Sequence, residues 1–215
     1  MNHQSHNHVG IIMNNRYIAA IALSALLGAC SNSESPSAPG APAPEAPPAA
    51  SNVVVVSEAD AAYNEGKRML EASTSDVELS NAVNRLLQAA ELDSADAKVL
   101  LAKLYQEGRG VEQNPGQAVN LLLAASAKGN IRATYELGKA FETGSGVEKN
   151  PGEALNNYLK AAAAGDRDAM FEVAKAFESG NGVAANKDEA IGWYRKAAGA
   201  GHPTAADSLK ALEAR

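Results

Sequence analysis

The sequence predicts an all-α fold, an α/α solenoid built from helix–turn–helix repeats, and three observations lead to this prediction. Three Gly-x-Gly-Val motifs begin at Gly108, Gly144 and Gly180, so they recur with a period of 36 residues. An asparagine follows the valine of each motif at the same spacing, at Asn114, Asn150 and Asn186. An alanine series keeps the period without interruption, through Ala61, Ala97, Ala133, Ala169 and Ala205. Self-similarity at a fixed period of this size is typical of stacked repeat arrays.

The composition suits thin helices in close contact better than one thick globular core. Of the 215 residues, 46% are hydrophobic, with many alanines among them, and only 5% are aromatic. The formal net charge of −6 argues against nucleic acid as a partner, because binding to phosphate requires a basic surface. Cys30 is the single cysteine, so no intrachain disulfide forms and no Cys/His pattern has zinc-ligand spacing.

Residues 13–29 have the organisation of a secretory signal peptide. A positively charged start is followed by an apolar run of about ten residues, which is too short to span a membrane. Residues 1–12 precede this start, so we interpret them as an extension upstream of a true start at Met13. Metal binding is the alternative interpretation of the extension, because it carries His3, His6 and His8.

The signal peptide ends in Leu27-Gly28-Ala29-Cys30, which resembles the lipobox of bacterial lipoproteins. The resemblance implies that the Cys30 sulfur carries diacylglycerol, that cleavage occurs before Cys30 and that the new amine is acylated. Ser31 is compatible, in the same family, with export to the outer membrane of a Gram-negative cell. We therefore expect a lipid-anchored protein of the bacterial cell envelope. A chance cysteine after an ordinary signal peptide is the alternative.

Residues 30–52 are predicted to be an extended, disordered tether between the lipid anchor and the folded part. The segment mixes proline with alanine, serine and glycine, and such a composition cannot bury an apolar face. Its prolines are Pro36, Pro39, Pro42, Pro44, Pro47 and Pro48. The repeat domain is expected to occupy residues 53–215 and to begin near a short run of valines.

Each repeat is predicted to contain two helices, as unit 95–130 illustrates. Gly108 ends the first helix, since glycine readily adopts the left-handed conformation of a C-terminal cap. Asn114 caps the second helix, with proline at its first position, and Gln117 is expected to complete a capping box. Gly129 ends the second helix. The predicted core stripe of the first helix is Ala97, Leu101, Leu104 and Tyr105.

The period divides the folded part into successive units. Units 95–130, 131–166 and 167–202 carry the full pattern. Unit 59–94 lacks the Gly-x-Gly-Val loop and is interpreted as a degenerate first repeat. Residues 203–215 are predicted to form one amphipathic helix that covers the last open face, as the terminal units of solenoids do.

The last full unit carries the most complete motif, with Ala190, Trp193, Tyr194, Ala197, Ala198 and Gly201. This pattern resembles the Sel-one-like repeat, a tetratricopeptide-like α/α unit, and the resemblance extends over residues 59–215. It implies a right-handed superhelix whose concave groove is lined by the first helix of each unit, and an adaptor role instead of catalysis. Leu121 and Asn157 stand where tryptophan is common in that family.

One face of the first helices is the candidate binding surface. Lysines recur with the period, and the residue four positions earlier is aromatic in three of the four units. Helical geometry places Val99 and Lys103 opposite the core stripe, so this face is expected to line the groove. The predicted protein-binding residues are Lys103, Tyr135, Lys139, Phe171 and Lys175. Two alternatives remain: a solvated face on which Glu136 and Glu172 balance the lysines, and aromatic rings that pack between neighbouring units.

The sequence offers little support for an enzyme. It contains no Ser-x-x-Lys or Lys-Thr-Gly motif of β-lactam-binding enzymes and no phosphate-binding loop or other cofactor motif. His202 is the one histidine beyond the signal peptide, and it is interpreted as a polar turn residue. We therefore expect a membrane-anchored scaffold that binds a protein or peptide. A cell-envelope hydrolase acting on β-lactams or peptidoglycan and a peptidoglycan-binding spacer are the alternatives.

Overall fold

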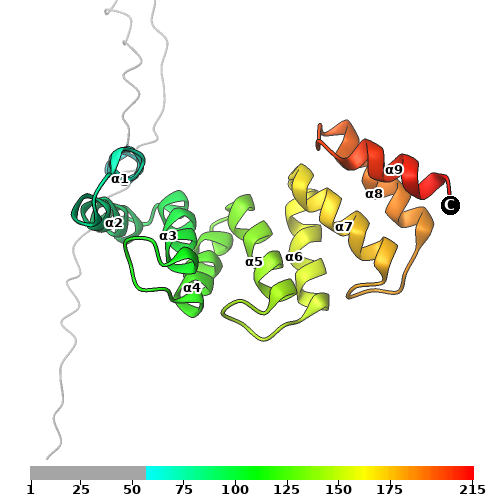
Figure 1. The fold of residues 1–215 in the computed structure, drawn as a ribbon, viewed down its shortest axis with the longest axis horizontal. Helices are drawn as coiled ribbons and strands as arrows, with labels where there is room; N and C mark the ends of the chain where they lie inside the picture. Colours follow the sequence, from blue (N-terminus) through cyan, green and yellow to red (C-terminus); the bar gives the residue numbers. More distant parts are fainter. Residues whose placement is uncertain (1–56) are drawn as a thin grey trace, which may run out of the picture. The chain divides into compact units, whose positions relative to one another are not determined.

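The computed structural model describes residues 57–215, which form helices joined by turns and contain no strand (Figure 1). The predicted signal peptide, Cys30 and the tether lie outside the described residues. The helices are α1 (Glu58–Ala72), α2 (Asp76–Glu91), α3 (Ala95–Glu107), α4 (Pro115–Ala127), α5 (Ile131–Thr143), α6 (Pro151–Ala163), α7 (Arg167–Ser179), α8 (Lys187–Gly199) and α9 (Ala205–Glu213). The predicted all-α repeat fold is thereby confirmed.

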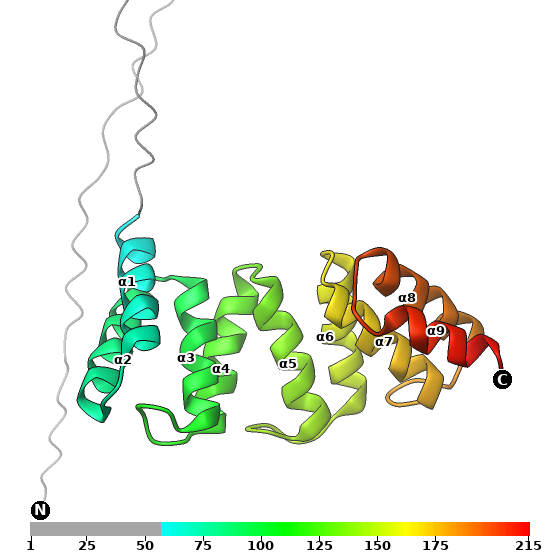
Figure 2. The same ribbon diagram turned by 45° about the horizontal axis from the view of Figure 1, so that its top comes forward.

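The helices follow one another in space in the order of the sequence, as Figures 1 and 2 both show. The main packing contacts join consecutive helices, from α1 against α2 through to α8 against α9. The loops between α3 and α4, α5 and α6, and α7 and α8 lie along one edge of this array (Figure 2). This arrangement is a solenoid in which each pair of helices is covered by the next pair.

The core is built mostly from alanine and leucine, as the predicted stripe requires. Ala97, Leu101 and Leu104 of α3 are fully buried, whereas Tyr105 is half-buried. Small alanine side chains let neighbouring helices approach closely, so a solenoid with few aromatic residues still excludes water. At the C-terminal end, Leu212 of α9 packs against Tyr194 of α8 and closes the last apolar cluster.

The helix starts follow the prediction in one respect and differ from it in another. The Asn114 side chain accepts a hydrogen bond from the N–H of Gln117 at 2.9 Å, so asparagine is the N-cap of α4. The capping box expected at this position is wrong, because the N–H of Asn114 donates to the carbonyl of Tyr105 at 2.8 Å. A true capping box forms at the start of α2, between Ser75 and Glu78.

The Gly-x-Gly-Val loops do more than reverse the chain, because they also hold one unit against the next. Gly144 is the left-handed cap of α5, with φ of 80°. Gly146 follows with φ of 78°, and a Cβ placed on it would lie 2.2 Å from the carbonyl oxygen of Pro115 at the start of α4. Gly182 approaches Pro151 at the start of α6 in the same way. The second glycine of these two loops is thus a contact between repeats.

The first unit departs from the others at the turn that leads to the second unit. Asp93 has a positive φ of 73° at the position where the later units have glycine. Its carboxylate pairs with Lys98 of α3 and with Lys128 at the end of α4. The two lysines also hold the pKa of Asp93 below its usual value, with hydrogen bonding as the main cause. This turn therefore contributes a polar link between the first two units.

Candidate protein-binding groove

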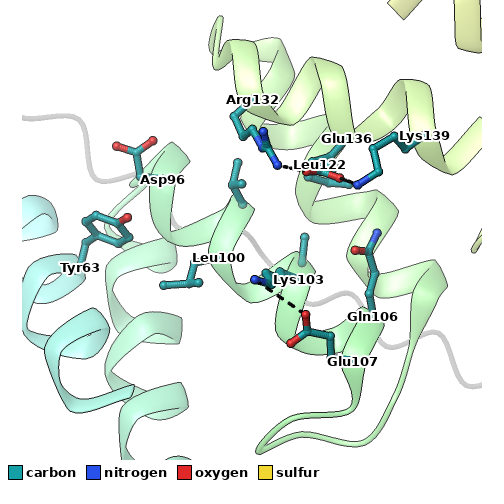
Figure 3. A pocket seen from close by; sticks show the side chains of 12 residues that line it. Tyr63, Asp96, Leu100, Lys103, Gln106, Glu107, Leu122, Arg132, Glu136 and Lys139 are labelled. Atoms are coloured by element: carbon teal, nitrogen blue, oxygen red, sulfur yellow. Dashed lines mark hydrogen bonds and ion pairs between the residues drawn. The ribbon is translucent and has the colours of Figure 1, made fainter. Parts of the chain in front are cut away.

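The exposed sides of α1, α3, α5 and α7 form what we call the first-helix face. A hollow of about 450 Å³ opens on this face, between α3 and α5. Figure 3 shows Asp96, Leu100 and Lys103 of α3 on one side and residues of α5 on the other, with Tyr63 of α1 beside them. The family resemblance predicts the groove on this face, so the hollow is the candidate binding site.

The bottom of the hollow is apolar. Val99, Leu100 and Ala102 come from α3, and Leu122 reaches the hollow from α4. Ala102 and Leu122 are buried, whereas Val99 and Leu100 are half-buried. Gln106 lines the same hollow, one turn further along α3 than Ala102. An apolar floor with one amide group suits a ligand that buries carbon and makes few polar contacts.

The rim of the hollow is charged, and its charges are paired. On α5, the carboxylate of Glu136 forms ion pairs with Arg132 at 2.7 Å and with Lys139 at 2.9 Å. On α3, Lys103 lies 3.8 Å from Glu107. Such exposed pairs add little to stability, about 0–1 kcal/mol each. Their role at a binding site is to orient a partner and to exclude a mismatched one.

The structure brings only two of the predicted lysines together at this hollow. The side chains of Lys103 and Lys139 are 66% and 48% exposed, and both line it. Lys175 pairs with Glu172 at 2.6 Å and lines a separate hollow of about 60 Å³ beside α6. The pairing that the sequence offered as an alternative, with a glutamate three residues before each lysine, is therefore present at Lys139 and Lys175.

The aromatic residues of the first helices pack against the neighbouring second helices, which is the alternative that the sequence leaves open. Tyr135 is only 9% exposed and its ring centroid lies 5.7 Å from that of Tyr158 in α6. The Phe171 ring lies 5.4 Å from that of Tyr194 in α8. Tyr135 also belongs to the apolar cluster that joins α5, α6 and α7, so it packs between neighbouring units. The rings pack inward because burial of aromatic surface stabilises the helix pair.

Two hydrogen bonds fix the buried tyrosines to the first helices. The Tyr158 hydroxyl donates to Glu142 and the Tyr194 hydroxyl donates to Glu178, each at 2.7 Å. Burial raises the pKa of both tyrosines well above its ordinary value, and the adjacent carboxylate raises it further. Each hydroxyl therefore stays protonated, and keeps its bond, to a higher pH than the hydroxyl of an exposed tyrosine.

His202 is more than the polar turn residue that the sequence suggests. Its imidazole stacks on the Phe171 ring with a centroid distance of 4.1 Å and an interplanar angle of 12°. Its Nε2 lies 3.9 Å from a carboxylate oxygen of Asp168, and its side chain is 12% exposed. His202 thus packs the turn before α9 onto the first-helix face of α7.

Several residues that line the hollow lie outside the lysine and aromatic series to which the sequence points. They are Arg132 and Glu136 of α5, Asp96 and Glu107 of α3, and Leu122 of α4. Leu122 can be recognised in the sequence when the repeats are compared, because the next two units have tyrosine at the same position.

Within residues 57–215, no group of three or more His, Cys, Asp or Glu side chains is placed to hold a metal ion. None of the helices in this range is both long enough and apolar enough to cross a bilayer. The hollow on the first-helix face is lined by the exposed Lys103 and Lys139 together with apolar residues of α3 and α4.

The 36-residue period also matches a known family. The Sel1 repeat matches residues 95–130, 131–166 and 167–202, which together are half of the chain. The chain belongs to the Sel1 repeat family. Proteins built from Sel1 repeats serve in general as scaffolds for protein interactions. A search of curated proteins finds no match to the chain.

Solved structures agree with this membership. A Sel1 repeat protein from Oxalobacter formigenes is 30% identical with a TM-score of 0.62, over 69% of this chain and 57% of that one. The protein c5321, a protective antigen of uropathogenic Escherichia coli strains with an SLR fold, is 30% identical with a TM-score of 0.67, over 71% and 32% of the two chains. This Sel1 repeat chain thus spans little more than half of the first protein and about a third of the second.

A third structure supports the fold alone. Cysteine-rich protein B (hcpB) of Helicobacter pylori is 24% identical with a TM-score of 0.51, and the match covers 64% of this chain and 98% of that one. The Sel1 repeat solenoid is thus shared with proteins of quite different length, whose partners need not be the same.

Proposed function

We propose that this protein is a lipid-anchored bacterial lipoprotein that binds a protein partner through the hollow between α3 and α5. The observation that carries the proposal is the hollow itself, with its apolar floor and its rim of paired charges. Its volume of about 450 Å³ falls within the roughly 300–1,000 Å³ of typical ligand sites. The scaffold role of Sel1 repeat proteins in general supports a protein as the ligand.

The rim supports a partner with both signs of charge along the groove. Among the residues that line the hollow, α5 contributes the two cations Arg132 and Lys139 and the one carboxylate Glu136, and Asp168 of α7 also lies 3.8 Å from Arg132. Asp96 and Glu107 give the α3 side two carboxylates for the single cation of Lys103. A peptide that lies between the two helices would therefore meet an acidic side and a basic side, which fixes its orientation.

The proposed anchor rests on the sequence that precedes the folded part. Cys30 closes the lipobox-like tetrapeptide, and residues 30–52 would separate the membrane from the first helix. Two or three acyl chains hold a protein stably on a bilayer, whereas one chain gives only marginal binding. Ser31 is compatible with export to the outer membrane of a Gram-negative cell.

A site-specific photocrosslinker tests the groove in the full chain and in its own cell. A benzoylphenylalanine that replaces Lys103 projects from the rim of the hollow, whereas one that replaces Asn120 projects from exposed α4 outside it. We expect a discrete adduct from the Lys103 position that is absent from the Asn120 position. The same adducts from both positions, or none from the Lys103 position, would contradict the groove as the binding site.

The anchor has its own test, which does not depend on the partner. Cells that express the chain are fed a labelled fatty acid, and membranes are then separated from soluble protein. We expect the unaltered chain to carry the label and to sediment with the membranes. The Cys30→Ser chain should carry no label and should remain in the soluble fraction. If the Cys30→Ser chain still sedimented with membranes and carried the label, the lipoprotein assignment would be wrong.

A further inference from the structure

Three positions at the hollow carry smaller or less polar side chains than the same positions in the next two units. The period of 36 residues relates each position of unit 95–130 to its counterparts. The three sets are Val99 with Tyr135 and Phe171, Gln106 with Glu142 and Glu178, and Leu122 with Tyr158 and Tyr194. In unit 95–130, two aromatic rings are therefore replaced by aliphatic side chains and a carboxylate is replaced by an amide.

In the later units these three positions form one interlocked group. Phe171 packs edge-on against Tyr194, with ring centroids 5.4 Å apart, and the Tyr194 hydroxyl donates to Glu178 at 2.7 Å. Unit 131–166 repeats the arrangement with a ring pair at 5.7 Å and the same tyrosine–glutamate bond. Two rings thereby fill the space between the first and second helix of units 131–166 and 167–202.

In unit 95–130 the same space is open. Val99, Gln106 and Leu122 all line the hollow on the first-helix face, so the hollow lies where the ring pair is missing. Tyr63 of α1 lines it as well and offers an aromatic neighbour. A cavity of about 150 Å³ is enough to take up benzene. The volume of about 450 Å³ therefore leaves room for a ring and for the backbone that carries it.

We propose that the hollow receives an aromatic side chain, Phe, Tyr or Trp, from a partner peptide. The inserted ring takes the place of the missing ring, with Val99 and Leu122 beneath it. The Gln106 amide replaces a carboxylate and offers both a donor and an acceptor to a hydroxyl or an indole N–H. This inference rests on the proposed function and specifies the chemistry of the partner.

The charges of the lining favour a neutral anchor. Three cations and three carboxylates surround the hollow, namely Lys103, Arg132 and Lys139 with Asp96, Glu107 and Glu136. Most of them are already paired, so a charged side chain would have to displace an existing partner. An aromatic ring needs no such exchange, and buried aromatic anchors dominate the binding energy of many interfaces.

Neither the predicted tether nor the part of the chain that the structure describes presents an exposed aromatic ring. Residues 30–56, which follow the predicted cleavage site, contain no phenylalanine, tyrosine or tryptophan. Within residues 57–215, the large exposed hydrophobic residues are aliphatic, so a second copy of this part presents no exposed ring to insert. An external peptide is therefore the occupant to which the chemistry points.

A variant that restores the missing group tests this inference. V99F/Q106E/L122Y transplants the side chains of unit 167–202 into unit 95–130, where Ala102 already matches Ala174. The variant should fill the hollow with the same interlocked contacts and keep the helical content of the chain. Val77→Phe makes the same kind of change at a site in α2 that is 71% exposed and lies outside the hollow, so it is the matched control.

The probe is a displayed library of random short peptides, panned against the full chain. We expect the unaltered chain and Val77→Phe to retain peptides that share one aromatic residue. The best of these peptides should bind the filled variant at least about thirtyfold more weakly, which is the loss expected when a central anchor is removed. Replacing the shared aromatic residue of the peptide by alanine should give a loss of similar size.

The outcomes separate this inference from the proposed function. If the peptides bound the filled variant as tightly as the unaltered chain, the inference of an aromatic anchor would be overturned. The proposed function, binding of a protein partner, would still stand. A chain that retains no peptide would overturn both. If the filled variant lost its helical signal, a competition experiment on the unaltered chain would replace it. The competitor is p-cresol, which carries the ring of tyrosine. Displacement of the bound peptide by p-cresol supports the anchor, and failure to displace it overturns the anchor.

Discussion

Substitution of Gly146 by alanine tests whether the Gly-x-Gly-Val loops bind one repeat to the next. Gly146 lies in the loop between α5 and α6 with a positive φ of 78°. An added Cβ would lie 2.2 Å from the carbonyl oxygen and 2.4 Å from the carbonyl carbon of Pro115. Because both atoms belong to backbone at the start of a capped helix, they cannot rotate away as a side chain would.

The expected loss of stability has two parts. Alanine in the left-handed conformation costs about 1–2 kcal/mol relative to glycine. The overlap with the preceding unit adds about 1–3 kcal/mol, as overpacking generally does. Gly146→Ala should therefore lower the free energy of unfolding by about 2–5 kcal/mol.

Gly165→Ala is the control that isolates the contact between units. Gly165 has φ of 94°, so alanine there is also strained, but no atom lies within 4 Å of the added Cβ. The two variants should therefore differ by the steric part alone. For a domain of this size, a loss of 1 kcal/mol lowers the melting temperature by about 2–4 °C, so the difference should be about 2–12 °C.

Thermal unfolding followed by circular dichroism measures both variants in the full chain. Urea midpoints provide a second measure, since repeat arrays can unfold unit by unit. If Gly146→Ala melted at the same temperature as Gly165→Ala, the loop would be a turn and nothing more, and the proposed contact between units would be refuted.

Three further predictions concern the aromatic residues. Tyr158→Phe should lower the free energy of unfolding by about 1–2 kcal/mol in urea denaturation, because it removes the charged hydrogen bond to Glu142; an unchanged midpoint would show that the bond adds nothing. His202→Ala should lose about 0.5–1.5 kcal/mol of stacking on Phe171, whereas His202→Phe should retain it, and equal losses would contradict a stacking role. Burial raises the pKa of Tyr135 to about 12, whereas tyrosine in the unfolded chain has a pKa of about 10. The urea midpoint should therefore fall as the pH rises from about 10 to 12. A fall of the same size in Tyr135→Phe would assign the effect to other groups.

The regular parts of the fold could be predicted from the sequence because they depend on neighbours along the chain. The cap at Gly108 and the side-chain bond of Asn114 follow from local backbone preferences, and the structure has both. The core stripe at Leu101 and Leu104 follows from helical periodicity, and both residues are buried. The hollow lies on the first helices α3 and α5, and the register fixes which of their residues share that face.

The missed features depend on partners that a local pattern does not contain. The expected capping box is absent because the carbonyl of Tyr105, across the loop, takes the N–H that the box requires. The sequence places Tyr135 on the face of its helix that lies opposite the core stripe, and from that position alone it cannot be told whether the ring is exposed or packed. It is buried because Tyr158 and the next unit cover that side of the ring.

By itself, the sequence determined the repeat, its register and the helices of each unit. Only the tertiary structure decided where the array is open. The hollow exists because Val99 and Leu122, which lie on different helices, are both small where their counterparts in later units are aromatic. In each of the two later units, rings stand at both positions and pack against each other. Close packing makes the open volume a property of the pair, and such a property appears only when the helices are stacked.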